Sequence, residues 1–256
     1  MSAERSGFEQ LEDEDPRRPW TWALFGLILP IAAFALDAGV QIDPILWGGP
    51  PGLGLGSRTG PLGLRQLVVY ALLGLSLLGT TSALFRPRTL LLNGATIALL
   101  TLAVLFALAH AIAYVPLLPA FVWGLLLLGL GALGFAPYLA LLAWLSQLVD
   151  CLRRQARLSQ GRLRWALTPL LAGPALIALA LSPLAVQQRA LERIRGGDPA
   201  HVRAGLAQLG PLARWSRGEL AALYADLEAE SQVRLRNHYL ELFDRDVHDD
   251  MPSRLR

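Results

Sequence analysis

The sequence contains no lysine, so all 23 of its basic residues are arginines. Without an ε-amine the chain cannot perform Schiff-base chemistry on a lysine, and it lacks the lysine that P-loop proteins and kinases use. Its single cysteine, Cys151, cannot form an intramolecular disulfide, a thiolate zinc site or an iron–sulfur cluster. Only His110 among the four histidines lies in an apolar stretch, which argues against a haem held by two histidines within the membrane. The sequence therefore predicts no cofactor, no metal site and no catalytic residues.

Charged residues are also scarce. They make up 17% of the chain, against about 25% in ordinary soluble domains, while 54% of the residues are hydrophobic. The long uncharged runs that result exclude a soluble enzyme, a disordered protein and a nucleic-acid-binding module as descriptions of the whole chain. The formal net charge is +3, but the arginines cluster beside apolar segments. Membrane topology explains this clustering better than an anionic partner does, so the predicted partners are the lipid bilayer and other membrane or periplasmic subunits, with no nucleic acid.

Five apolar segments approach or exceed the roughly 20 residues that a helix needs to cross a bilayer. They cover residues 20–36, 66–85, 89–114, 117–148 and 165–186. The sequence therefore predicts an all-α fold: a polytopic α-helical membrane protein with five transmembrane helices and a small C-terminal α-helical domain. The fourth segment is too long for one straight span and contains Pro137, so we expect it to kink, to tilt, or to extend past the membrane into residues 151–154.

The arginines also predict how the chain is threaded. Ten of them flank the predicted spans on one side of the bilayer, and two lie in the short loops on the other side. Cytoplasmic flanks carry the excess of arginine, and the arginine-only usage indicates a high-GC bacterial genome. We therefore expect an inner-membrane protein with its N-terminus in the cytoplasm and its C-terminus outside. The predicted parts are an acidic cytoplasmic tail (1–19), a transmembrane domain (20–186) and an extracytoplasmic α-helical domain (187–256).

The longest connection between predicted spans, residues 38–64, is rich in glycine and proline. Its G-L-G-L-G run lacks the preceding strand and following helix that a dinucleotide-binding loop needs. Two interpretations stay open: a compact irregular loop, or a loop that docks a partner, because long ordered loops tend to be functional.

Two ionisable residues lie at predicted membrane depth, where charge is expensive. Asp37 ends the first apolar segment, and His110 lies near the outer end of the third, with Tyr114 one helical turn further on. The threading puts Asp37 and His110 at a similar depth. They predict either an outer-leaflet site for protons or a ligand, or a purely structural arrangement in which Asp37 caps its helix and His110 bonds a backbone carbonyl.

Small residues recur in the fourth segment, and small side chains let helices approach closely in lipid. This segment is therefore expected to be the packing centre of the bundle or a subunit contact. The candidate helix-packing residues are Gly124, Gly129, Gly131 and Gly134. The fifth segment contains three prolines, each of which frees a backbone carbonyl, so neighbouring groups or local water are expected there.

The C-terminal region has the pattern of several amphipathic helices. Asp198 and Pro199 after a Gly-Gly turn predict a helix start, with aspartate as the N-cap and proline in the first turn. Ser216 followed by Glu219 predicts a capping box that opens the next helix. A last helix carries the apolar residues Val233, Leu235, Tyr239, Leu240 and Phe243.

Residues 198–210, from Asp198-Pro199 through Val202-Arg203 to Leu209-Gly210, resemble the second helix of a HEAT-like repeat. Val-Arg recurs at residues 233–234 and Leu209 recurs at Leu240, both 31 residues on, which suits a two-helix repeat. The resemblance implies stacked helical hairpins that bind other proteins. Two units fall below the three usually needed for a stable array, so support from the membrane domain, a partner or a second copy is expected. An ordinary helical cap of three or four helices is the open alternative.

These patterns favour a non-enzymatic structural or scaffold subunit of the inner membrane that docks partner proteins through its C-terminal helical domain. The candidate docking residues are Asp198, Arg203, Trp215 and Arg234. The alternative function is a small transporter or channel component that uses membrane-embedded Asp37 and His110.

Overall fold

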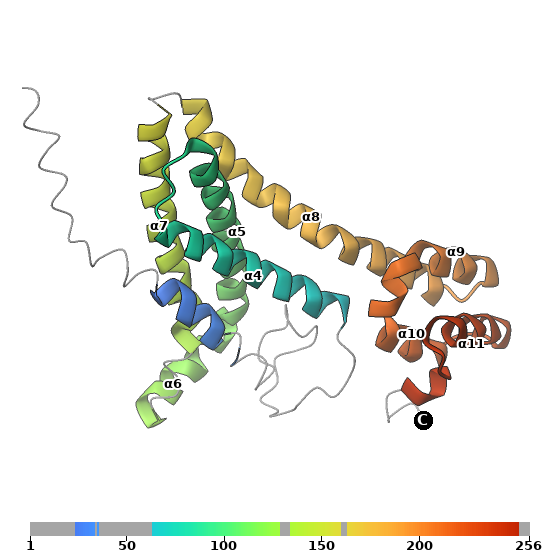
Figure 1. Cartoon of the computed structure of the whole chain (residues 1–256). Helices are drawn as coiled ribbons and strands as arrows, with labels where there is room; N and C mark the ends of the chain where they lie inside the picture. Colours follow the sequence, from blue (N-terminus) through green and yellow to red (C-terminus); the bar gives the residue numbers. More distant parts are fainter. Residues whose placement is uncertain (1–23, 34, 36–62, 129–133, 160–162, 251–256) are drawn as a thin grey trace, which may run out of the picture. The chain divides into compact units, whose positions relative to one another are not determined.

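The structure is a computed structural model that describes residues 24–33, 35, 63–128, 134–159 and 163–250. Within these ranges the secondary structure is helical throughout, without strands (Figure 1). A short apolar helix, Leu24–Ala33, comes first. The labelled elements are α4 (Leu64–Leu84), α5 (Leu90–Tyr114), η1 (Val115–Leu117), α6 (Leu118–Leu128), α7 (Ala136–Leu158), α8 (Leu163–Arg195), α9 (Pro199–Leu209), η3 (Gly210–Trp215), α10 (Arg217–Tyr224), α11 (Ala229–Phe243) and η4 (Val247–Asp250).

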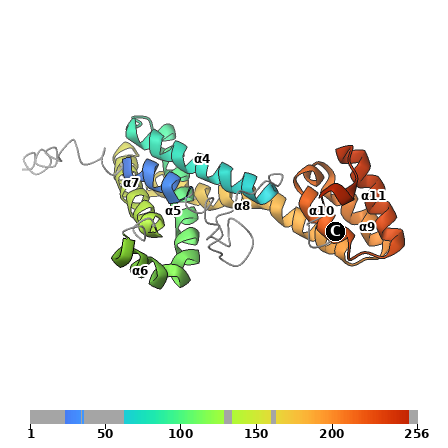
Figure 2. The same cartoon turned by 90° about the horizontal axis from the view of Figure 1, so that it is seen from below.

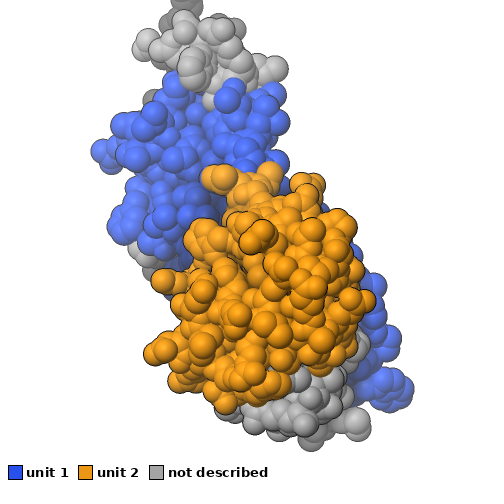
Figure 3. All heavy atoms as spheres, turned by 90° about the vertical axis from the view of Figure 1, so that its right-hand side faces the viewer, with its two compact units in different colours: residues 1–56, 72–177 blue, residues 57–71, 178–256 orange. Residues whose placement is uncertain are grey.

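The chain divides into two compact units (Figure 3). The first, which we call the apolar unit, takes its described residues from 1–56 and 72–177. The second, the C-terminal unit, takes them from 57–71 and 178–256. The residues of α4 and of α8 are shared between the two units. The boundary between the units in α8 falls at residues 177/178, whereas the sequence-based division falls at 186/187.

Three helices are long and apolar enough to cross a membrane, which confirms the membrane character that the sequence predicts. They are Leu64–Leu84, the run Leu90–Leu126 that joins α5, η1 and most of α6, and Leu167–Arg195. They correspond to the second, third and fifth predicted segments. The first predicted segment is described only as the short helix Leu24–Ala33, and the rest of it lies outside the described residues.

The described residues of the fourth predicted segment form two separate helices, so the alternative of one helix kinked at Pro137 is wrong. Its first part forms α6, whose 11 residues span only about 16 Å. Its second part forms α7, a helix of 23 residues that begins at Ala136. Pro137 therefore lies in the first turn of a new helix, where its missing N–H costs nothing, rather than at a kink. The expectation that the segment extends past residue 148 is confirmed, because α7 continues to Leu158.

Helices α5 and α7 form the antiparallel pair at the centre of the apolar unit (Figures 1 and 2). At one end of the pair Asn93 of α5 bonds Cys151 and Gln155 of α7, and at the other end the Tyr138 hydroxyl of α7 donates to the Ala111 carbonyl of α5 at 2.9 Å. The core between them combines small and medium side chains with one tryptophan. It consists of Ile97, Leu100, Ala103, Ala107, Trp144, Leu148 and Cys151.

Helix α5 receives close glycine contacts from two other helices of the apolar unit, α4 and α8. A Cβ atom added at Gly79 of α4 would lie 2.8 Å from the Leu99 Cβ, and one added at Gly173 of α8 would lie 2.7 Å from the Thr101 Cβ. Both neighbours belong to α5, so two helices use a glycine to approach it closely. These two glycine contacts therefore fall on the same stretch of α5, residues 99–102.

The outward faces of the apolar helices carry large hydrophobic side chains. Leu78 of α4 is 56% exposed, Ile112 of α5 62%, Leu142 of α7 54% and Leu171 of α8 74%. A water-soluble monomer rarely exposes so much contiguous apolar surface, whereas lipid solvates it at no cost. The exposed faces therefore agree with the membrane assignment, and they show that α7 is apolar on its outer side even though it is not among the three long apolar helices.

Helix α8 remains one helix of 33 residues despite its three prolines. Pro183 has no N–H to donate to the carbonyl of Leu179, four residues earlier. The Ser182 hydroxyl donates to that carbonyl instead, at 2.8 Å. A side chain next to the proline thus replaces the lost backbone hydrogen bond, as the sequence led us to expect of a neighbouring group.

The C-terminal unit has a hydrophobic core of its own, formed by the last turns of α8 with α9, η3, α10, α11 and η4. Its buried members include Ile194, Leu209, Leu220, Leu235 and Val247, all with no exposed surface. Helices α8 and α9 approach closely at Gly205, where an added Cβ would lie 2.7 Å from the Ala190 carbonyl oxygen. The predicted start of α9 is confirmed: Gly197 turns the chain with φ +79°, Asp198 is the N-cap and Pro199 follows in the first turn. This core shares no residue with the core between α5 and α7.

The predicted capping box at Ser216 is wrong. Ser216 occupies the N-cap position of α10, but its ψ of 13° is not the extended backbone of a capping residue, and its side chain bonds no N–H of the helix. Its hydroxyl instead donates to the Leu212 carbonyl and accepts from the Gln187 amide, both at 3.0 Å. The serine ties α8 to η3 in the interior of the unit.

The HEAT-like spacing does not correspond to two equivalent units. Val202 is fully buried, but Val233, 31 residues on, is 59% exposed. Leu209 is fully buried, but Leu240 is 53% exposed. Structural repeats place equivalent residues in equivalent environments. The described C-terminal unit is therefore a small helical domain with one core, and the sequence recurrence is not a structural repeat.

Candidate functional site

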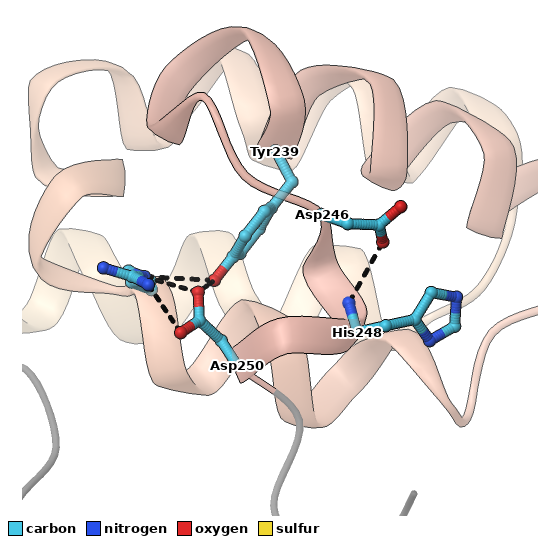
Figure 4. Close-up of polar contacts among 5 residues, drawn as sticks. Tyr239, Asp246, His248 and Asp250 are labelled. Atoms are coloured by element: carbon cyan, nitrogen blue, oxygen red, sulfur yellow. Dashed lines mark hydrogen bonds and ion pairs between the residues drawn. The ribbon is translucent and has the colours of Figure 1, made fainter.

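The described part of the C-terminal unit contains one buried cluster of charged and hydroxyl groups, which we call the carboxylate clamp. It consists of Arg217 at the start of α10, Tyr239 in α11 and Asp250 at the end of η4. The guanidinium Nε and Nη2 each lie 2.5 Å from one oxygen of the Asp250 carboxylate. The Tyr239 hydroxyl donates to the same carboxylate (Figure 4).

The clamp is well shielded from solvent. The side chains of Arg217 and Asp250 are 21% and 15% exposed, and Tyr239 is fully buried. The guanidinium also lies 5.8 Å from the centre of the Phe243 ring, one helical turn beyond Tyr239. A two-pronged arginine–carboxylate pair in such surroundings is the strongest type of charged hydrogen bond.

The electrostatics of the clamp fix the charge state of each member. Burial alone would raise the pKa of Asp250, but the hydrogen bonds from Arg217 and Tyr239 outweigh it and lower the pKa below its ordinary value. The bond to Asp250 raises the pKa of Arg217. Burial, aided by the bond to Asp250, raises the pKa of Tyr239. At neutral pH the clamp is thus an arginine cation, a carboxylate and a neutral phenol.

A second ion pair lies on the outside of the same segment. Arg236 of α11 bonds the Asp246 carboxylate. The same carboxylate accepts from the backbone N–H of His248 at 3.1 Å, as Figure 4 shows. The His248 N–H is the largest cause, and Arg236 the next, of a lowered pKa for Asp246. The His248 ring lies edge-on to Tyr224 at 5.1 Å. These contacts position η4, but they are open to water and contribute little to stability.

Of the predicted intramembrane site, the structure describes His110 and Tyr114, whereas Asp37 lies outside the described residues. The rings of His110 and Tyr114 stack at 5.0 Å, and Tyr114 in turn contacts Phe121 of α6 at 5.4 Å. His110 is 8% exposed and lies on the wall of a small apolar cavity beside Trp144. The proposed pairing of Asp37 with His110 stays a prediction, and so does the transporter function that depends on it.

Only part of the candidate glycine set is described. Gly134 precedes α7 and packs against the Phe121 ring, where an added Cβ would lie 2.2 Å from Cγ. It thereby folds α6 back onto the start of α7. Gly124 is half-buried in α6, and Gly129 and Gly131 lie outside the described residues.

The four predicted docking residues are all exposed at the surface of the C-terminal unit. Asp198 lies 3.4 Å from the His201 Nδ1 on α9, and Arg234 bonds Glu230 within α11 at 2.7 Å. Trp215 ends η3 with 37% of its surface exposed. Arg203 projects from the outer face of α9. They are available to a partner, but the contacts of Asp198 and Arg234 are with their own helices rather than with each other.

Sequence reasoning missed two polar clusters. The clamp joins residues 33 positions apart in the chain, and no local pattern indicates such a pairing. The other cluster is built on Asn93 in the apolar third segment, whose Nδ2 donates to the Cys151 carbonyl at 2.9 Å and to the Gln155 Oε1 at 2.8 Å. An asparagine in an apolar helix is itself a signal of interhelical hydrogen bonding.

Replacing Asn93 with alanine is expected to make the thiol of Cys151, the only cysteine of the chain, more accessible to reagents. Cys151 is 1% exposed, so a maleimide reagent should label it slowly in the folded protein. Losing both interhelical bonds should destabilise the α5–α7 contact by about 1–2 kcal/mol and speed labelling about tenfold. Labelling rates in mild detergent measure this effect. The control is Asn237→Ala, at the exposed asparagine of α11, and equal rates for both variants would contradict a clamping role for Asn93.

In the part of the chain that the structure describes, no three or more histidine, cysteine, aspartate or glutamate residues are grouped to hold a metal ion. The class defined by the structure is an all-helical protein with three helices able to span a membrane, joined in sequence to a helical C-terminal unit. Comparisons with protein-family models, with curated proteins and with solved structures find no match for this chain.

Proposed function

We propose that this chain is a multi-pass protein of the bacterial inner membrane that acts as a scaffold subunit. Its N-terminus lies in the cytoplasm, and its C-terminal unit binds a partner protein on the extracytoplasmic side. The observation that supports this proposal most directly is the composition of α8. The helix carries exposed apolar side chains such as Leu171 and Leu179, and further along it supplies Ala190 and Ile194 to the core of the C-terminal unit.

A helix of this kind anchors a folded domain at a membrane. Leu171 and Leu179 are 74% and 69% exposed, which suits contact with lipid, whereas Ile194 is fully buried within protein. The domain that α8 supports offers an exposed tryptophan, Trp215, and exposed arginines. Tryptophan and arginine are the residue types most enriched at the energetic centres of protein interfaces. Partner binding is therefore the function that this arrangement favours.

The proposed threading predicts opposite accessibility for two engineered cysteines. In a Cys151→Ser background, Ala207→Cys on the exposed face of α9 should react with a membrane-impermeant maleimide in intact spheroplasts. Arg88→Cys, in the exposed connection before α5, should react only after the membrane is permeabilised. Labelling of both residues from the same side would contradict the proposed topology.

Partner binding predicts position-dependent cross-linking. A photo-reactive amino acid at Trp215 should form a discrete adduct with a second protein in native membranes. The matched control is the same amino acid at Leu171 in α8, which is even more exposed but is expected to face lipid. The same amino acid can be placed at Arg203 and Arg234. The absence of an adduct from all three positions 203, 215 and 234 would count against the scaffold function.

A further inference from the structure

The last described turn of the chain is bound to its own domain in the manner of a peptide ligand. Val247 and Asp250 lie three residues apart in η4, a 3₁₀ turn in which such residues lie on the same side. Val247 is fully buried in the core of the C-terminal unit, and Asp250 is held by the carboxylate clamp. The turn therefore inserts one aliphatic side chain and one carboxylate, side by side, against α10 and α11.

The receiving surface has the chemistry of a carboxylate receptor. Arg217 binds both oxygens of Asp250 through two nitrogens, and Tyr239 adds a hydroxyl donor. Phe243 lies under the guanidinium and restricts its orientation. This fork geometry recognises a carboxylate as such, because the planar donor pair matches the two oxygens of any aspartate or glutamate side chain.

The connection between α11 and η4 is short, and its ion pair with α11 lies on the solvent-exposed side. It leaves α11 at Asp244, a non-glycine residue with φ +52°, and passes Asp246, whose ion pair with Arg236 is open to solvent. Beside these exposed contacts and the His248–Tyr224 ring contact, the buried attachment of η4 consists of its two inward groups, Val247 and Asp250. A segment that offers the same two groups would compete for the same positions.

We infer that the surface beneath η4 is the docking site of the partner, and that η4 is a built-in competitor for it. This inference rests on the proposed scaffold function. The partner segment that fits carries an aliphatic residue three positions before an aspartate or glutamate, because that spacing reproduces Val247 and Asp250. Charge complementarity to Arg217 requires the acid. A second copy could exchange its η4 only if the two surfaces lay within the roughly 10 Å that residues 244–246 can span, so a separate partner is the favoured occupant.

The test uses the full chain in mild detergent and a fluorescent peptide that copies residues 244–250. Asp250→Ala frees the clamp and should bind the peptide at least tenfold more tightly than the unsubstituted chain does. A peptide with asparagine in place of its final aspartate should bind at least tenfold more weakly, and Arg217→Met added to Asp250→Ala should abolish binding. Asp246→Ala is the matched control, since it removes the exposed ion pair and leaves the clamp filled, so its affinity should equal that of the unsubstituted chain.

Hydrogen exchange provides a second measurement that needs no substitution. Saturating peptide should speed exchange of the backbone amides of residues 247–250 in the unsubstituted chain, because η4 is displaced, while α9 stays protected. Failure of the peptide both to bind Asp250→Ala and to speed this exchange would overturn the inference and leave the clamp as a contact of the fold. A concentration-dependent dimer of Asp250→Ala in place of peptide binding would assign the site to a second copy and also overturn it.

The outcome is separable from that of the scaffold function. A cross-linked partner at Trp215 without any peptide effect would refute this docking site alone. Peptide binding without a partner in the membrane would refute the scaffold function and keep the site.

Discussion

Replacing Gly79 with leucine is expected to destabilise the apolar unit by about 3 kcal/mol, a large effect for one substitution. A Cβ at this position would meet the Leu99 Cβ at 2.8 Å, the Leu99 carbonyl carbon at 3.1 Å and the Leu100 nitrogen at 3.2 Å. Two of these three atoms belong to the backbone of α5, which cannot rotate away as a side chain could. The added side chain must therefore push α4 and α5 apart along their contact.

The same helix provides the control. Gly74 lies in α4 five residues earlier, and an added Cβ there would meet nothing within 4 Å. Gly74→Leu should be neutral or should stabilise the helix by up to about 1 kcal/mol, because glycine is a poor helix former. The apparent unfolding temperature in detergent, followed by maleimide labelling of buried Cys151, separates the two variants. Equal unfolding temperatures would show that α4 and α5 do not pack through Gly79.

This contact illustrates what the sequence could and could not predict. Apolar length alone predicts α4, α5 and α8. The predicted start at residue 89 lies one residue before α5, whose cap is Thr89, which accepts a hydrogen bond from the Leu92 N–H at 3.3 Å. Helix α8, in contrast, continues nine residues past the predicted end at residue 186, because its last turns pack in the core of the C-terminal unit. The sequence does not predict which glycines contact another helix, because Gly74 and Gly79 both fit the same small-residue pattern. Only the rotation of α4 about its axis decides that Gly79 faces α5, and rotation is set by the whole packed bundle.

The break between α6 and α7 could not be predicted from the sequence, for a similar reason. A proline inside an apolar run is compatible with a kink or with the first turn of a new helix. Pro137 takes the second role, and the tight contact of Gly134 with Phe121 accompanies the change of direction. The run is apolar on both sides of the break, so hydropathy carries no sign of it.

The carboxylate clamp shows most clearly what the sequence does not predict. Arg217 and Asp250 lie in polar stretches that read as solvated surface, and each has other potential partners nearby in the chain. Their pairing depends on the fold of the intervening α10 and α11, which brings the end of η4 onto the start of α10. Local rules predicted a capping role for Ser216 next to Arg217, but its hydroxyl instead accepts a tertiary hydrogen bond from Gln187 and donates to the Leu212 carbonyl four residues earlier.

Replacing Arg217 with methionine is expected to destabilise the C-terminal unit by about 2 kcal/mol at pH 7. Breaking a fully buried pair costs about 3–5 kcal/mol, and the 21% and 15% exposure of the two side chains reduces the penalty. The control is Arg234→Met, which breaks an exposed pair with Glu230 at 2.7 Å and should cost no more than about 0.5 kcal/mol. Hydrogen exchange of α10 and α11 in the full chain reads the stability of this unit directly. Similar losses of protection in both variants would show that the clamp is no stronger than a surface ion pair.

The pH dependence of the stability of the C-terminal unit tests the role of Arg217 in a second, independent way. The pKa of Asp250 is lowered in the folded chain, so its stabilising contribution is complete above the unfolded pKa of about 3.9 and is lost as the pH falls through the folded value. The raised pKa of Tyr239 acts at the other end, where its contribution is complete below about pH 10 and is lost as the pH rises through the folded value. In Arg217→Met the burial of Asp250 is no longer offset by the guanidinium, so its folded pKa should rise above the unfolded one. Protection of α10 and α11 should then increase as the pH falls from 7 towards 4, whereas the unsubstituted chain should lose protection below pH 4. An acid response of the variant identical to that of the unsubstituted chain would show that Arg217 does not set the charge of Asp250.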